Sequence, residues 1–110
     1  MRPLHPHERP LVDALFENAG LLPPVTATLV AERDDGGMGS LAFEPLGRRL
    51  GGTVSECQFT DADGVLVCAA LNVDDAGFPL ELDLWKVDFE PLLRWPEKAQ
   101  LVRWSSETGR

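Results

Sequence analysis

Residues 65–87 have the sequence VLVCAALNVDDAGFPLELDLWKV, and this stretch decides the fold that we predict. Two mostly apolar runs, 65–73 and 78–87, flank a short turn of Asp and Gly residues. Asp starts turns by accepting hydrogen bonds from backbone amides, and Gly ends them by adopting positive φ. In the second run leucines alternate with polar residues, as in a strand with one buried face. The stretch therefore predicts an antiparallel hairpin.

A four-residue turn, 74–77, aligns the apolar residues of the two runs on one face of this hairpin. Because side chains alternate between the two faces of a strand, the intervening polar residues then share the opposite face. The pairs predicted by this alignment are Val73 with Phe78, Leu71 with Leu80, Ala69 with Leu82, and Val67 with Leu84.

A second turn, residues 61–64, joins the first run to another β-rich segment, 53–60. A three-residue loop in this turn pairs Cys57 with Ala69 and sends Cys68 to the opposite face. A four-residue loop would place the two thiols directly across from each other, but it would also pair polar residues with apolar ones. We favour the three-residue loop, which predicts two reduced cysteines and no disulfide.

The N-terminal half of the chain predicts one helix and two further strands. Apolar residues of segment 7–19 recur on one helical face, and Gly20 ends the pattern. Pro10 has no amide hydrogen and is tolerated in a first turn, so the helix should begin close to it. Segments 25–33 and 40–44 carry the β-branched or alternating residues of strands.

The C-terminal part predicts short elements. Residues 88–96 are expected to form a helical turn between two prolines, residues 99–104 a short extended or helical segment, and residues 105–110 a frayed tail. A length of 110 residues suits a single domain. We therefore predict one α+β domain over residues 1–104, with an N-terminal helix packed on a five-stranded, mainly antiparallel meander sheet and a short C-terminal helical segment.

Charge excludes two classes of partner. The chain has 18 Asp and Glu against 10 Lys and Arg, a net charge of −8. Nucleic acids and anionic membranes bind proteins through an excess of Lys and Arg, so neither is an expected partner. No apolar run approaches the roughly 18 residues of a membrane-spanning helix, and the first residues lack the apolar region of a signal peptide. With only two cysteines, the chain is expected to be cytoplasmic.

Motifs for catalysis or cofactor binding are weak. The glycine-rich residues 36–40 lack the Lys and the following helix of a phosphate-binding loop. Turns 61–64 and 74–77 lack the Glu that completes a calcium loop, although two such turns meeting at one end of the sheet could hold a weakly bound divalent ion. His5 and His7 lie at an N-terminus expected to fray, without further ligands for a metal. We predict no catalytic residue, no metal and no cofactor.

One surface is unusual. In the predicted register, the polar face of the sheet carries a tryptophan among acidic residues, and Trp in a polar setting is typical of an interface hot spot. The alternative is that the C-terminal segment, with Trp95 and Trp104, covers this tryptophan. The predicted partner-binding residues are Glu56, Gln58, Asn72, Glu81, Asp83 and Trp85.

Four segments together resemble a small family of uncharacterised bacterial proteins of about this length. They are DGGMGSL (35–41), DADGV (61–65), LNVD (71–74) and ELDLWKVDF (81–89), and the resemblance spans roughly residues 11–93. The family has no assigned activity and no agreed site residues. The resemblance therefore implies a bacterial single-domain protein and carries over no catalytic role.

Acidity and the tryptophan-bearing face together predict a non-enzymatic module that binds a basic protein, as an immunity protein neutralises a toxin or nuclease. A first alternative is an accessory or structural domain that dimerises through an exposed sheet edge, so a monomer and a homodimer both fit the sequence. A second alternative is a small hydrolase with paired carboxylates. Such an enzyme would need a pocket that holds an Asp or Glu with a raised pKa.

Overall fold

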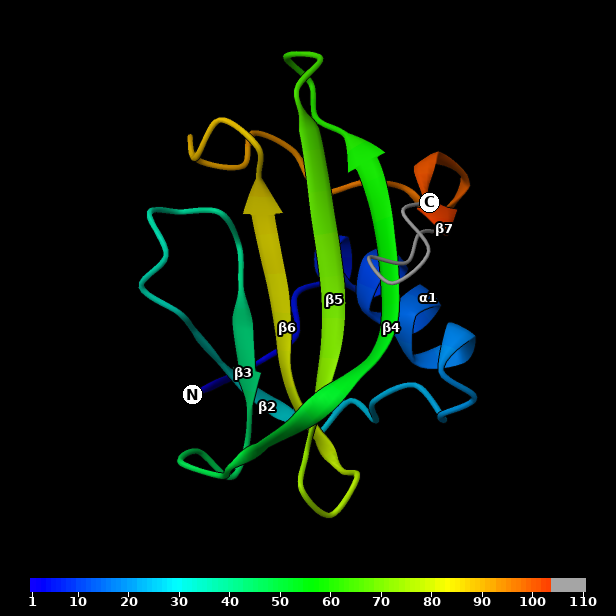
Figure 1. The fold of residues 1–110 in the computed structure, drawn as a ribbon, viewed down its shortest axis with the longest axis vertical. Coiled ribbons are helices and arrows are strands. Elements are labelled where there is room, and N and C mark those ends of the chain that lie inside the picture. Colours follow the sequence, from blue (N-terminus) through cyan, green and yellow to red (C-terminus); the bar gives the residue numbers. More distant parts are fainter. Residues whose placement is uncertain (104–110) are drawn as a thin grey trace.

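An N-terminal helix, α1 (Arg9–Asn18), packs against one face of an antiparallel sheet in the computed structural model, which describes residues 1–103 (Figure 1). This is the predicted α+β class, but the sheet has seven strands rather than five. The predicted tail, 105–110, and Trp104 lie outside the described residues. The other elements are β1 (Arg2–Pro3), η1 (Pro6–Glu8), β2 (Leu29–Glu32), β3 (Leu41–Phe43), β4 (Leu50–Thr60), β5 (Leu66–Asp74), β6 (Pro79–Lys86), η2 (Lys98–Gln100) and β7 (Val102–Arg103).

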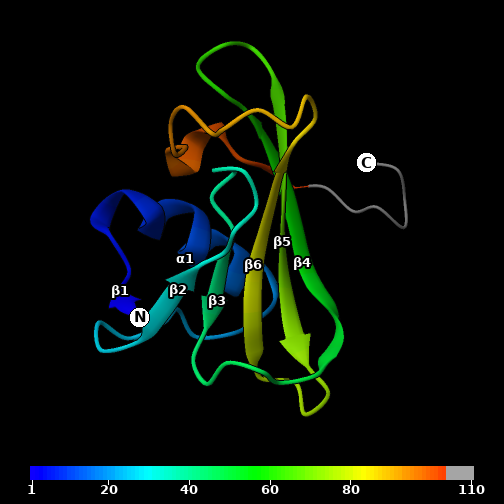
Figure 2. The same cartoon turned by 90° about the vertical axis from the view of Figure 1, so that its left-hand side faces the viewer.

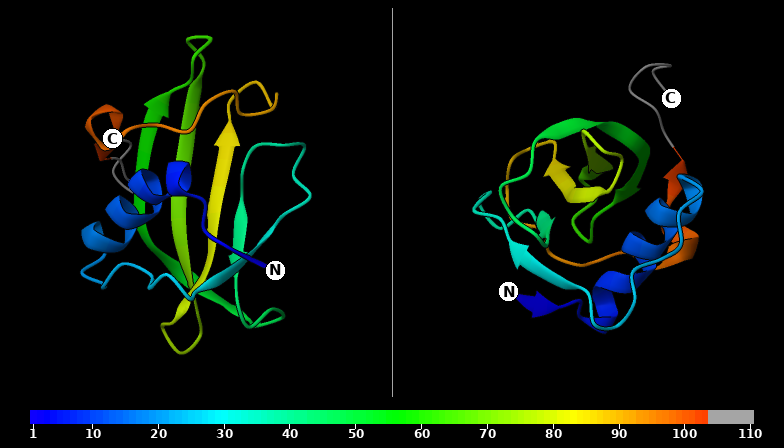
Figure 3. Two further views of the ribbon diagram at one scale, coloured as in Figure 1. Left: turned by 180° about the vertical axis from the view of Figure 1, so that it is seen from behind. Right: turned by 90° about the horizontal axis from the view of Figure 1, so that it is seen from below.

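The helix has the predicted limits. Pro10 lies in its first turn, where a missing amide costs no hydrogen bond. At its end Gly20 adopts a φ of 74°, and the amide of Leu21 donates to the carbonyl of Phe16 at 2.9 Å. The buried side of the helix covers the rear of the sheet, as Figures 2 and 3 show. Its buried residues are Leu11, Val12, Ala14, Leu15 and Phe16.

The β4–β5 hairpin has the predicted register. The amide of Asp61 donates to the carbonyl of Val65 at 2.9 Å, and Gly64 adopts a φ of 81°, which closes a three-residue loop. Cys57 and Cys68 consequently lie on opposite faces of the sheet, and both are free thiols. The prediction of no disulfide between them is confirmed.

The β5–β6 hairpin differs from the predicted register by two residues. Leu71 pairs with Leu82 rather than with Leu80. The turn closes over three residues, 75–77, and the ladder has an irregularity after Asn72, so the two strands are offset. A shift of two residues keeps every side chain on its predicted face, because the side-chain period of a strand is two. Val67, Ala69, Leu71, Leu82 and Leu84 therefore face the core as predicted, whereas Phe78, which was expected on the same face, lies in the turn and is exposed.

The strand order corrects the predicted meander. The order across the sheet is β1-β2-β3-β6-β5-β4-β7, so β3 pairs with β6 instead of β4. β4, β5 and β6 are three consecutive hairpin strands, and β3, which precedes them, lies beside the last of the three, which is a Greek key read in the reverse chain direction. The connection between β3 and β4 therefore crosses one end of the sheet, at the bottom of Figure 1. The outer strands, β1 and β7, have two residues each and are too short for a hydrophobic period to indicate them.

Arg48 holds this crossover in place. Its guanidinium donates to the carboxylate of Asp74 at 2.9 Å and to the carbonyl of Pro79 at 2.8 Å. The first residues of β4 then pass close to the end of β5: a Cβ added at Gly51 would lie 2.2 Å from the carbonyl oxygen of Asp74. This half of β4 curls over the ends of β5 and β6 (Figures 1 and 3).

Two segments differ from the sequence prediction. The strand expected at 25–33 forms only over Leu29–Glu32, because the amide of Thr28 bonds to the carbonyl of Val25 in a turn. The helical turn expected at 88–96 does not form, and the helical segment near the C-terminal end is η2. Within residues 88–96, Pro91 and Pro96 lack amide donors and restrict the residues before them to extended conformations.

The core lies between α1 and the sheet, and the C-terminal segment closes its upper end (Figure 2). Burying a side chain of leucine size contributes roughly 2 kcal/mol, so this cluster is the main source of stability. No helix in the part of the chain that the structure describes is long and apolar enough to cross a membrane. The sheet contributes Val30, Leu41, Phe43, Cys57, Phe59, Val67, Ala69, Leu71, Leu82 and Leu84 to the core.

Gly51→Ala is expected to lower the free energy of unfolding by about 2 kcal/mol, since an added methyl group would force β4 and β5 apart. Urea denaturation followed by circular dichroism measures this change. The matched control is Gly52→Ala, because a Cβ at Gly52 meets no atom within 4 Å. Equal stabilities of the two variants would contradict the close approach of β4 to β5.

Candidate functional site

The six predicted partner-binding residues lie on the sheet face that points away from α1, toward the viewer in Figure 1. We call these six residues the acidic face. Strand pairing arranges them in rows that cross β6, β5 and β4, as expected from the alternation of side chains along each strand. The rows are Trp85–Cys68–Gln58, Asp83–Ala70–Glu56 and Glu81–Asn72–Thr53.

Members of the acidic face differ in accessibility. Asn72 is buried, and its amide oxygen accepts a hydrogen bond from the Thr53 hydroxyl at 2.7 Å, so this residue joins β5 to β4. The other five are half-buried. Glu81 lies 3.6 Å from the guanidinium of Arg33, while Asp83 has no cation within 4 Å among the described residues.

Trp95 does not cover Trp85. It lies on the other side of the sheet, where it packs against the hydrophobic core and meets the ring of His7 edge-on at 6.2 Å. The alternative that Trp95 covers Trp85 is therefore wrong. The other tryptophan of the C-terminal segment, Trp104, lies outside the described residues. No described helix packs on the acidic face (Figure 2).

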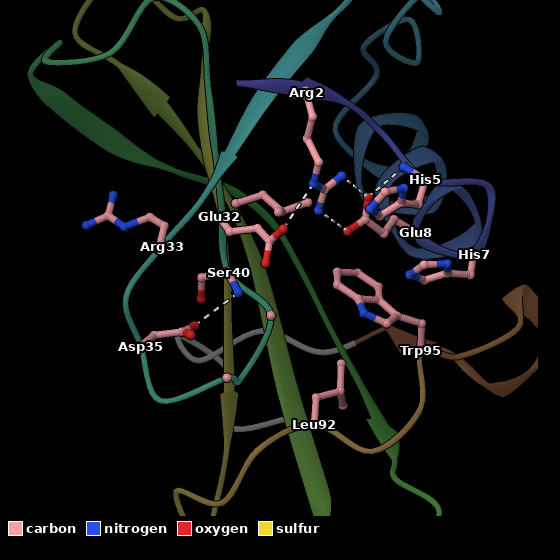
Figure 4. Close-up of a pocket in the computed structure, with 13 residues that line it drawn as sticks. Arg2, His5, His7, Glu8, Glu32, Arg33, Asp35, Ser40, Leu92 and Trp95 are labelled. Carbon is pink, nitrogen blue, oxygen red and sulfur yellow. Dashed lines mark hydrogen bonds and ion pairs between the residues drawn. The ribbon is translucent and has the colours of Figure 1, made fainter.

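A polar cavity of about 340 Å³ opens on the helix side, where the N-terminal segment, the glycine-rich loop and the C-terminal segment meet (Figure 4). We call it the N-terminal pocket. The sequence alone does not indicate this pocket, because its residues come from three separate stretches of the chain, 2–8, 32–41 and 92–95. Its lining residues are Arg2, His5, His7, Glu8, Glu32, Arg33, Asp35, Gly37, Gly39, Ser40, Leu41, Leu92 and Trp95.

A charged network fixes one wall of the pocket. The guanidinium of Arg2 donates to the two carboxylate oxygens of Glu8 at 2.9 and 2.8 Å and to Glu32 at 3.1 Å. Glu8 also accepts the backbone amide of His5 at 2.7 Å. Burial raises the pKa of Glu8, but the Arg2 guanidinium and the His5 amide outweigh it, so the pKa lies below its ordinary value. The expected fraying of this N-terminus is therefore wrong.

Asp35 shapes the glycine-rich loop on the opposite wall. Its carboxylate accepts the amides of Met38 at 3.1 Å and Ser40 at 3.0 Å. Burial raises the pKa of Asp35, but the hydrogen bonds from Ser40 and the loop amides outweigh it and lower the pKa. A carboxylate of the chain itself thus takes the loop amides that a phosphate would need, which agrees with the prediction of a structural turn.

Glycine allows this loop to pack tightly against the C-terminal segment. The amide of Leu92 donates to the carbonyl of Gly37 at 3.0 Å. Gly39 adopts a φ of 104°, and a Cβ there would lie 3.1 Å from the indole of Trp95. A side chain at this position would be strained by the positive φ and would press against the Trp95 indole.

Lys86 is a buried cation that the sequence analysis overlooked. Its side chain is 1% exposed, and its ammonium lies 2.9 Å from the carboxylate of Asp61 and 2.7 Å from that of Asp63. Burial lowers the pKa of Lys86, but the two carboxylates outweigh it and raise the pKa to about 12. Its position in the sequence could have predicted this burial. Lys86 lies two residues after Leu84, so its side chain points to the same, core-facing side of β6.

Asp61 links this cation to the C-terminal segment. Its carboxylate accepts the backbone amides of Leu93 at 2.9 Å and Arg94 at 3.1 Å. The turn predicted only as a tight connection therefore anchors the segment that carries Trp95. Within residues 1–103, no group of three or more His, Cys, Asp or Glu side chains is arranged to hold a metal ion.

Asp61→Ala is expected to lower the free energy of unfolding by about 3 kcal/mol, since it removes one partner of a buried ion pair and leaves backbone amides without acceptors. Thermal and urea denaturation measure the loss. Asp34→Ala is the control, because Asp34 is exposed and outside these contacts. A loss equal to that of the control would contradict the anchoring role of Asp61.

Acid is expected to destabilise the fold. The pKa values of Glu8, Asp35 and Asp61 lie below their ordinary values of 4.5 for Glu and 3.8 for Asp. A carboxylate with a lowered folded-state pKa stabilises the protein above its unfolded-state pKa, and this stabilisation disappears as pH falls through the folded-state pKa. Urea denaturation should therefore give a free energy of unfolding that falls below about pH 4.

Glu8→Gln provides the check on this pH dependence, since it removes one of the carboxylates with a lowered pKa while keeping a side chain of similar size. The variant should show a shallower loss of stability in acid than the unchanged protein. A free energy of unfolding that stays constant between pH 5 and pH 3 would contradict the assignment.

A family model described as a domain of unknown function (DUF6984) matches residues 1–96, which include α1, β1 to β6 and all the residues of the acidic face and the N-terminal pocket. Neither the curated proteins nor the solved structures give a match to the chain. The predicted resemblance to an uncharacterised family without assigned activity is confirmed, and the chain belongs to the family of the domain of unknown function DUF6984.

Proposed function

We propose that the chain is a non-enzymatic module of a bacterial cytoplasm that binds a basic protein through its acidic face, as an immunity protein binds a toxin or nuclease. The observation that carries the proposal is the setting of Trp85. It lies half-buried beside Asp83 and Glu81 on a sheet face that no described helix covers. Aromatic residues within a polar surround are the usual anchors of protein interfaces.

Charge on this face supports a basic partner. Most acidic side chains elsewhere have partners within the fold: Asp61 and Asp63 bind Lys86, and Asp74 binds Arg48. Asp83 has only a long contact, 3.4 Å, to the hydroxyl of Ser40. A carboxylate without a cation beside an aromatic side chain gains most from a Lys or Arg of another protein, and such charge complementarity accelerates association.

The two alternatives differ in their support. Dimerisation through a sheet edge has an available edge, because β7 pairs with only Cys57 and Gln58 of the 11-residue strand β4 and leaves residues 50–55 without a second strand in the described part of the chain. A hydrolase with paired carboxylates needs an acid with a raised pKa, whereas every described Asp or Glu with a displaced pKa is shifted downward. These carboxylates are Glu8, Asp35, Asp61, Asp63 and Asp74.

Trp85→Ala is expected to weaken binding by about 2 kcal/mol, or roughly thirty-fold, because an interface anchor is lost. The immobilised full chain captures proteins from a lysate of the encoding organism, and mass spectrometry identifies them. The dissociation constant of the purified partner is then measured for each variant by calorimetry. Affinity should also fall as salt rises, since the charges of the two surfaces are screened.

The matched control is Phe78→Ala, an aromatic truncation at an exposed site in the turn before β6. It should leave the dissociation constant unchanged. If both truncations weaken binding equally, or if neither does, the acidic face is not the interface. Sedimentation provides a separate check, because a stable homodimer that buries Trp85 would favour the accessory-domain alternative.

A further inference from the structure

The N-terminal pocket has polar groups that the fold does not use. The carboxylate of Glu32 receives Arg2 on one oxygen, while its other oxygen has no partner in the described residues. The indole N–H of Trp95 and the ring nitrogens of His7 also have no hydrogen-bond partner there. These groups line one cavity, and Figure 4 shows Glu32 and Trp95 projecting into it from different elements.

Charge decides which ligands this pocket favours. The ionised lining residues are three carboxylates and two guanidinium groups, and one of the latter, Arg33, also contacts Glu81 on the other side of the sheet. Arg2 already serves two carboxylates, Glu8 and Glu32. These five groups together carry one net negative charge. A cation is favoured over an anion in such a site.

The aromatic wall adds a second preference for a cation. The indole of Trp95 forms part of the lining, and the ring of His7 meets it edge-on, with centroids 6.2 Å apart. Ammonium and guanidinium groups bind over aromatic rings, most strongly over Trp. The tight packing at Gly39 fixes the indole, so the wall is formed before a ligand binds.

We propose that the N-terminal pocket binds a compact organic cation with an alkylammonium or alkylguanidinium group, held by the free oxygen of Glu32 and the ring of Trp95. A cavity of about 340 Å³ is at the small end of the range for ligand pockets, which suits a compact group. The ligand could be a free small molecule or a side chain of a basic peptide, since the recognised group is the same. The proposal does not depend on the acidic face.

The test uses the ¹⁵N-labelled full chain and nuclear magnetic resonance titration. Butylamine and butylguanidinium are the free probes, and a capped Gly-Arg-Gly peptide is the peptide probe. Either kind of cation should shift the indole N–H resonance of Trp95 and the amides of the pocket walls saturably. Stronger binding of the free probes identifies a small-molecule ligand, and stronger binding of the peptide identifies a protein side chain. The Trp95 resonance is assigned by its loss in Trp95→Phe.

Glu32→Gln should raise the dissociation constant of the cation about five-fold, because it removes one exposed ion pair. Glu44→Gln is the charge-matched control, since Glu44 is an exposed carboxylate outside the pocket, and it should leave the constant unchanged. Both carboxylates are on the surface, so both variants are expected to fold.

Several results would overturn the proposal. They are the absence of saturable shifts with every cation, shifts that affect the Trp85 indole as strongly as that of Trp95, and saturable binding of acetate or phosphate in place of the cations. Equal affinities of Glu32→Gln and Glu44→Gln would also overturn it. The proposed function is tested separately, by partner capture and the affinity of Trp85→Ala, so failure of the cation proposal does not decide it.

Discussion

A buried ammonium group imposes the strictest constraint on this fold. Removing a charge from water costs several kcal/mol unless opposite charges and hydrogen bonds replace the water, so Lys86 requires both Asp61 and Asp63. These two carboxylates hold the β4–β5 turn against the end of β6. Because Asp61 also accepts amides of the C-terminal segment, the same cluster fixes where Trp95 enters the N-terminal pocket. A core charge thus sets the position of a surface cavity.

The net charge of −8 says little about binding until the position and partners of each acidic side chain are known. Many acids serve the fold, because they accept turn amides or neutralise a specific cation, as Asp74 does for Arg48. Such groups lose much of their capacity to attract a partner. Each of the two proposed recognition surfaces has one carboxylate that the fold uses little: Asp83 beside the half-buried Trp85, and Glu32 in the pocket that Trp95 lines. The two surfaces lie on opposite sides of the same sheet.

Local periodicity predicted much of this structure. The side-chain period of two placed Trp85 and its neighbours on one face even though the β5–β6 register was wrong by two residues, and it also places Lys86 in the core. The β3–β6 pairing could not be predicted in this way. It depends on a crossover that Arg48 holds through contacts with Asp74 and Pro79, which are distant from Arg48 in the sequence. The N-terminal pocket was missed for the same reason, since its walls meet only after the sheet has formed.

Opposite placement of the two cysteines makes the fold indifferent to the redox state of its surroundings. Burial, with a smaller contribution from Cys68, raises the pKa of Cys57 to about 12, so its thiol stays protonated and unreactive at neutral pH. Nothing in the described core depends on a covalent cross-link. The same chain can therefore hold the same shape in a reducing or an oxidising solution, and a partner would meet the same acidic face in either.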